Sequence, residues 1–153
     1  MRGLKRQLRL LRLRERVEKQ ARLRLALALR EDEERRLALA EAGTQLEEAR
    51  RLWSVELAEG LDAARWSLLQ SYLDQRQRGL ARREGLVAEW RPRLETAQGE
   101  LERAARERQA LERWAGRTAA RLRLEESRRE RRALDEIGLR ESLRRSAAEH
   151  GEE

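Results

Sequence analysis

The chain has 153 residues and a formal net charge of +7; 42% of its residues are charged and only 3% are aromatic. It contains no Cys and a single His, which excludes disulfides, thiolate chemistry and any catalytic or metal site built from two His side chains. Leu, Ala, Arg and Glu dominate the sequence, and all four favour helix. This composition predicts a long helix or coiled coil.

The positive charge is concentrated in an N-terminal arm. Residues 1–30 carry eleven Lys or Arg against two Glu, whereas residues 31–60 carry four Arg against nine acids. Arg interrupts the N-terminal Leu run, so we expect no signal peptide. The longest uncharged run, residues 66–73, is far shorter than the roughly 20 residues that span a bilayer. We therefore expect a soluble, cytoplasmic protein.

A first helix is predicted over residues 3–58. Alternating steps of four and three from Leu4 mark one face of this segment, and nine of its sixteen positions are apolar. This spacing is typical of a coiled-coil seam, meaning the stripe of side chains that faces a partner helix. The predicted seam positions are Leu4, Leu8, Leu11, Glu15, Glu18, Arg22, Leu25, Leu29, Asp32, Arg36, Leu39, Gly43, Leu46, Arg50, Trp53 and Leu57.

A turn is predicted at residues 58–64. Gly60 can adopt the left-handed conformation that ends a helix, and Asp62 can cap the helix that follows. The seam also loses its phase there, because continuing from Leu57 does not reach Trp66, where the next seam begins. A phase slip beside a Gly and a capping residue indicates a hairpin turn.

A second helix is predicted over residues 62–148, with a stronger seam. Thirteen of its seventeen positions are apolar and the phase never slips, which predicts a left-handed supercoil with a partner helix. These positions are Trp66, Leu69, Leu73, Arg76, Leu80, Arg83, Val87, Trp90, Leu94, Ala97, Leu101, Ala104, Arg108, Leu111, Ala115, Thr118 and Leu122.

The turn sets the register of an antiparallel hairpin. Residues on the two helices should meet where their numbers add to about 123, as they do for Leu57 and Trp66. This register places opposite charges together: Arg76 with Glu47, Arg83 with Glu41, Arg108 with Glu15, and Arg91 with Asp32. We expect one all-α domain over residues 1–153, a long two-helix antiparallel coiled-coil hairpin whose second helix overhangs at the C-terminus, unpaired beyond about residue 120.

The sequence offers no site for catalysis or for a cofactor. The lone His150 lies in a polar tail, and the nine Gly form no phosphate-binding loop. The many carboxylates alternate with a larger number of basic residues, as on solvated helix faces. We expect that the protein is not an enzyme and binds no cofactor, metal or small-molecule substrate.

Three short motifs resemble the FliJ family, the coiled-coil stalk proteins of the flagellar type III export apparatus. They are Arg65-Trp66 at the start of the second helix, Leu111-Glu112-Arg113-Trp114 with the Arg/Glu-rich run that follows, and Leu134-Asp135-Glu136-Ile137 near the end. The total length and the position of the hairpin agree with that family.

The resemblance implies a function in protein export. FliJ-like proteins resemble the γ stalk of rotary ATPases: they insert into the hexameric flagellar export ATPase and promote its assembly and hydrolysis. They also contact the cytoplasmic domain of the export-gate membrane protein and bind export chaperones. The protein would then be cytoplasmic and peripherally associated with the membrane-embedded apparatus.

On this basis we expect the basic segments, residues 9–16 and 121–132, to enter the ATPase ring. We expect the hairpin tip to face the export gate. Trp66, Trp90 and Trp114 recur every 24 residues, which fits packing at or beside the seam, but Trp114 is also a candidate contact for another protein. The candidate partner-binding residues are Arg9, Arg12, Arg14, Arg16, Trp114, Arg128, Arg129, Leu134, Asp135, Glu136 and Ile137, and those at the tip are Trp53, Trp66 and Tyr72.

Four other functions are open at this point. The same fold could serve as the stalk of a virulence-type secretion system, or as a coiled-coil spacer. The basic arm could bind nucleic acid, although its Arg alternate with seam Leu and acids follow after residue 30. Residues 2–30 could also lie on a membrane surface as an amphipathic helix.

Overall fold

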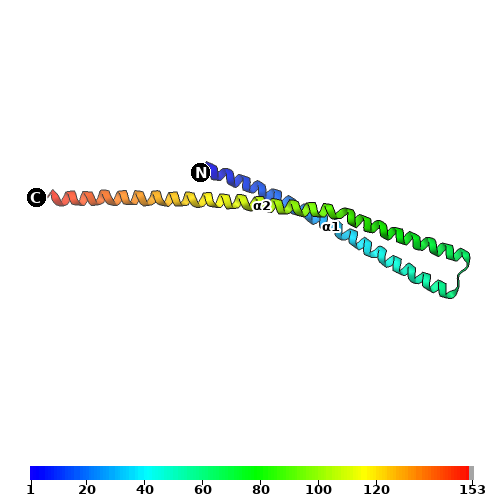
Figure 1. Cartoon of the computed structure of the whole chain (residues 1–153). Helices are drawn as coiled ribbons and strands as arrows, with labels where there is room; N and C mark the ends of the chain where they lie inside the picture. The colour runs from blue at the N-terminus through cyan, green and yellow to red at the C-terminus, as the bar shows by residue number, and fades with distance from the viewer. Residues whose placement is uncertain (152–153) are drawn as a thin grey trace. The chain divides into compact units, whose positions relative to one another are not determined.

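The computed structural model describes residues 1–151, and two helices account for almost all of them. Helix α1 spans Arg2–Glu59 and helix α2 spans Ala63–His150, with no strand in the described part of the chain. Figure 1 shows the two helices joined by one short link, from which α2 runs back along α1. The all-α hairpin expected from the sequence is confirmed.

The link between the helices is held by Gly60 and Asp62. Gly60 has a φ of 86°, the left-handed conformation that Gly adopts without strain, and its N–H donates to the carbonyl of Leu57 at 3.3 Å. Asp62 accepts a hydrogen bond from the backbone N–H of Arg65 at 2.8 Å, so it caps the first turn of α2. Both roles are those predicted from the sequence.

The chain divides into two compact units, each made of a piece of both helices. The turn unit, Val17–Ala105, contains the link; the end unit joins Met1–Arg16 to the residues from Arg106 onward. In the turn unit α1 and α2 lie antiparallel: as the residue number on α1 decreases, the residue number of its contact on α2 increases. The contacts are Trp53 with Trp66, Gln45 with Arg76, Ala28 with Trp90, and Arg24 with Glu100.

The seam predicted for α2 agrees with the burial of its side chains. Fifteen of the seventeen predicted positions are buried or half-buried, and only Trp66 and Arg83 are exposed. Three of these positions are Ala, namely Ala97, Ala104 and Ala115, and all three are buried. The steady heptad phase therefore located the packed face of α2 correctly.

The seam predicted for α1 is wrong at seven of its sixteen positions. The other nine, from Leu4 and Leu11 to Trp53, are buried or half-buried. The seven wrong positions are exposed and lie one residue too late; among them Leu8, Leu29 and Leu57 are 40%, 46% and 46% exposed. The residues just before these seven positions are Gln7, Arg14, Ala21, Ala28, Arg35, Ala49 and Glu56, and only Arg14 among them is exposed.

The error has a physical cause, which is that the helices pack through small side chains. Five of the six buried apolar residues are Ala, and no large side chain is fully buried in the described residues. Ala lets two helix backbones come close together, so a large side chain at the next position, such as Leu29 after Ala28, lies at the edge of the contact. Counting heptad steps from Leu to Leu along α1 therefore selected the edge of the seam at these positions.

Ala49 tests the corrected seam because it is only 2% exposed. Replacing it with Leu adds volume where α1 and α2 are closest, and we expect a loss of about 1–3 kcal/mol in the free energy of unfolding. Urea unfolding followed by circular dichroism measures this loss. Ala40→Leu is the matched control, because Ala40 lies on the exposed side of α1 and should cost little. Equal losses for the two variants would contradict the corrected seam.

Asp62 tests the cap of α2. Asp62→Ala leaves the N–H of Arg65 without its acceptor, and we expect about 1 kcal/mol of destabilisation in the same unfolding assay. Asp74→Ala, which removes an exposed carboxylate from the interior of α2, is the control. The cap is unimportant if the two variants unfold at the same urea concentration.

Candidate partner-binding surfaces

The end unit is strongly basic along the length where its two helices are paired and for a few residues of α2 beyond it. Residues 1–16 and 106–132 together carry seventeen Lys or Arg against six acids. Arg9, Arg12 and Arg16 are exposed on α1, and no ion pair joins them to another described residue. Arg14 differs, because its guanidinium forms an ion pair with Glu107 across the two helices. Three of the four predicted arginines on α1 are therefore open to a partner.

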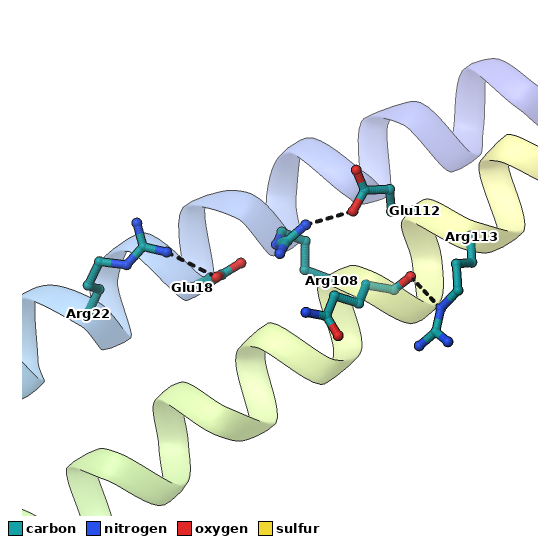
Figure 2. A network of polar contacts seen from close by, with 6 residues as sticks. Glu18, Arg22, Arg108, Glu112 and Arg113 are labelled. Carbon is teal, nitrogen blue, oxygen red and sulfur yellow. Dashed lines mark hydrogen bonds and ion pairs between the residues drawn. The ribbon is translucent and has the colours of Figure 1, made fainter.

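The ion pairs near the seam mostly lie within one helix. In the turn unit Arg22 bonds Glu18 at 3.1 Å along α1, and in the end unit Arg108 bonds Glu112 at 2.7 Å along α2 (Figure 2). Asp32, predicted to meet Arg91, bonds Arg36 of its own helix at 2.7 Å. Arg76 does cross to α1, but it donates to the amide oxygen of Gln45 at 2.8 Å, where the sequence predicted Glu47.

Trp90 makes the most specific contact between the two helices of the turn unit. Its indole N–H donates to the backbone carbonyl of Ala28 at 3.0 Å. The guanidinium carbons of Arg35 and Arg93 lie 4.2 Å and 5.2 Å from the centre of its ring. Both distances are within the range of cation–π attraction. Trp90 is thus half-buried in the hairpin and makes its hydrogen bond and its cation–π contacts within it.

The C-terminal part of α2 has no covering helix. Every described residue from Arg128 to Gly151 is exposed, and Figure 1 shows this end of α2 as a single ribbon. Arg128, Arg129, Asp135 and Glu136 are all exposed there.

Four apolar side chains are among these exposed residues. Leu134 and Ile137 are 67% and 53% exposed, and Leu139 and Leu143 are 62% and 67% exposed. At about 100° per residue, Leu134 and Ile137 share one side of the helix and the other two lie on roughly the opposite side. The sequence singled out Leu134 and Ile137, and the helix adds Leu139 and Leu143 as a second exposed apolar face.

At the hairpin tip the structure brings together two of the three predicted residues. The rings of Trp53 and Trp66 lie 4.6 Å apart at 54°, and Trp66 stays 43% exposed. Tyr72 does not join this pair, and the guanidinium of Arg76 lies 5.0 Å from its ring centre. Exposed aliphatic side chains extend the apolar surface near the tip: Leu52, Val55, Leu57 and Leu68.

Trp114 lines a groove of about 420 Å³ on the side of the end unit. The groove also contains Leu10, Arg14, Glu107, Ala110 and Leu111. Trp114 is 47% exposed and Leu10 is 40% exposed, so the groove has an open apolar wall on each helix. The sequence singled out Trp114 but not Leu10, because Leu10 lies off the predicted seam and only the hairpin register brings it to Trp114.

Metal clusters and membrane-spanning helices are two further kinds of feature. No group of three or more His, Asp or Glu within residues 1–151 is arranged to hold a metal ion. None of the described helix is both long enough and apolar enough to cross a membrane.

Comparison with known proteins assigns the chain to one family. The family model described as "Flagellar FliJ protein" matches residues 5–147, which is nearly the whole sequence. No curated protein and no solved structure matches the chain. The match includes both helices and the three motifs that the sequence shares with the family. The chain belongs to the FliJ family of flagellar proteins, and it is a structural component of the flagellar export apparatus.

Proposed function

We propose that this protein is the stalk of the flagellar export ATPase. One end of the hairpin enters the hexameric ring, promotes assembly of the ring and raises its rate of ATP hydrolysis. The observation that supports the proposal is that α2 extends beyond the part that is paired with α1. From residue 128 it continues as a single helix whose described residues are all exposed. A central stalk needs a stiff two-helix rod with one helix projecting beyond it, so that the projecting helix can be enclosed by a ring.

The charge of the end unit supports entry into an acidic pore. Arg9, Arg12 and Arg16 have no carboxylate partner among the described residues, so their charge is available to a partner. Arg128 and Arg129 are also exposed, at the start of the uncovered part of α2. Positive charge on a rod accelerates and orients its entry into a negatively charged cavity.

The uncovered part of α2 supports contact on more than one side. Leu134 and Ile137 lie on one side, while Leu139 and Leu143 lie on the other, which they share with Asp135 and Glu136. An isolated helix gains little from exposing large apolar side chains, and such exposure is typical of an interaction site. A ring that surrounds the helix could cover both sides at once.

The hairpin tip is proposed to face the cytoplasmic domain of the export gate. Its Trp53–Trp66 pair is half open to solvent and is bordered by exposed Leu and Val side chains. The end unit would then contact the ATPase and the hairpin tip would contact the gate, at a cytoplasmic position beside the membrane-embedded apparatus. Export chaperones are proposed to bind the same hairpin. We also propose that residues 1–153 function as one domain.

Charge reversal of the N-terminal arginines tests the ring contact. In the triple variant Arg9→Glu, Arg12→Glu, Arg16→Glu, we expect stimulation of the cognate export ATPase to fall by about tenfold or more, because the attraction to an acidic pore becomes repulsion. Steady-state ATP hydrolysis with and without the stalk measures the effect. Arg14 is left unchanged to keep its ion pair with Glu107.

The matched control reverses three exposed arginines of the turn unit, Arg78, Arg82 and Arg103, none of which forms an ion pair with a described residue. This variant has the same net charge and should stimulate hydrolysis normally. Equal loss in both triple variants would mean that total charge matters and that no basic end enters the ring.

Truncation of Leu134 and Ile137 tests the uncovered part of α2. Leu134→Ala with Ile137→Ala should weaken binding to the ATPase ring by about tenfold or more while leaving the unfolding curve unchanged, since both side chains are exposed. Leu139→Ala with Leu143→Ala tests the opposite side of the same helix, where a ring that encloses the helix predicts a comparable loss. Affinity measurements that show no loss for either pair would exclude both faces as contact sites.

A further inference from the structure

We propose that the groove beside Trp114 is a docking site for one amphipathic helix with an acidic polar face, supplied by a partner protein. The groove lies wholly in the end unit, between residues 10–14 of α1 and residues 107–114 of α2. The proposal deepens the partner binding proposed above, because it gives the chemistry of the segment that this surface would hold. It does not require that the bound protein be the ATPase.

The apolar part of the groove has the anchors that a helix needs. Trp114 stands on one side and Leu10 on the other, about half exposed, with Leu111 half-buried between them. Leu13, which is 54% exposed, lies one turn from Leu10 and extends the apolar wall along α1. A partner helix would insert side chains spaced three and four residues apart against these walls. Exposed Trp in such a position is the residue type that most often dominates binding energy.

The polar part of the groove is already neutral. Arg14 and Glu107 are paired with each other across the helices, so neither charge is left for a ligand at the bottom of the groove. A bound helix would therefore meet an apolar surface with its polar atoms satisfied, which lowers the cost of removing water from it. The unpaired charges lie outside the groove.

Those outer charges are positive and select the partner. Arg9 precedes Leu10 on α1, and Arg113 and Arg117 are one residue and three residues from Trp114 on α2. All three are exposed, and no described carboxylate pairs with them. Figure 2 shows the one bond that Arg113 makes, at 3.3 Å to the backbone carbonyl of Gln109, which leaves its charge uncompensated. Acidic side chains flanking the apolar face of a partner helix would complement this border.

A single-stranded nucleic acid is a poorer fit to the same surface. Proteins that bind it without sequence preference stack successive bases on several aromatic side chains. Trp114 is the only aromatic residue within residues 1–16 and 106–151, so these residues offer no second aromatic ring on which another base could stack. Leu10, Leu13 and Leu111 present aliphatic carbon, which complements Leu side chains of a helix better than phosphate or sugar.

The test uses the full chain labelled with 5-fluorotryptophan, whose four Trp give four fluorine resonances. Trp114→Phe assigns the signal of Trp114. The probe is a synthetic helical peptide of about 18 residues, or five turns, with Leu along one face and Glu on the others. We expect it to shift the Trp114 resonance and to leave that of Trp66, in the turn unit, unchanged.

Affinity measurements then identify the groove. Trp114→Ala and, separately, Leu10→Ala should raise the Kd of the probe by about tenfold or more. Leu68→Ala removes a side chain that is 72% exposed in the turn unit, and it should leave the Kd unchanged. Helix content measured by circular dichroism verifies that each variant is folded. Two groove variants are used so that the test remains valid if one of them does not fold.

Three results would overturn the proposal. One is equal or tighter binding of a peptide with Lys in place of Glu, or of an oligothymidine. Another is an unchanged Kd in both groove variants. The third is a shift of the Trp114 resonance when the chain alone is concentrated, which would assign the groove to a second copy. Because ATPase stimulation plays no part in this assay, failure of the stalk proposal and failure of the docking proposal give separate results.

Discussion

The close approach of two helices through Ala is the constraint on which the structure depends. Five of the six buried apolar side chains are Ala, and they occur on both helices: Ala21 and Ala49 on α1, and Ala97, Ala104 and Ala115 on α2. Each buries little surface, so the hairpin gains its stability from many small contacts along its length. The same constraint leaves little room for large side chains between the backbones, although Leu46 is buried there. Many other Leu, Trp and Val side chains lie farther out, exposed and available to partners.

The placement of Ala in the seam and of larger apolar side chains outside it explains why this highly charged chain has so many exposed apolar groups. Trp114 and Leu10 remain about half exposed because they flank a seam too narrow to cover them. Leu134 and Ile137 are exposed because α1 does not extend along that part of α2. Binding surfaces on a compact domain are usually confined to a cleft. Here they follow from packing geometry at the edges of the seam and from the difference in helix length.

Much of the fold could be predicted because its signals are local or strictly periodic. The Gly60 and Asp62 roles depend on neighbouring residues, and the α2 seam keeps one heptad phase. The α1 seam could not be predicted in the same way, since its true positions mix Leu with Ala and with polar residues such as Gln7 and Glu18. The groove beside Trp114 could not be predicted from the sequence for a different reason. Leu10 and Trp114 are far apart in sequence, and only the packed hairpin brings them together.

The polar residues of the turn unit show what fixes its register. Opposite charges that the sequence aligned across the helices bond largely within their own helix, as Asp32 does with Arg36. An ion pair within one helix is compatible with any register of the other, so it specifies none. Trp90 does specify a register, because its indole N–H can reach the carbonyl of Ala28 in only one alignment of the two helices. Its ring is also flanked by the guanidinium groups of Arg35 and Arg93. The alignment therefore depends on directional contacts between the helices, which include the hydrogen bonds of Trp90 with Ala28 and of Arg76 with Gln45, and on close Ala packing.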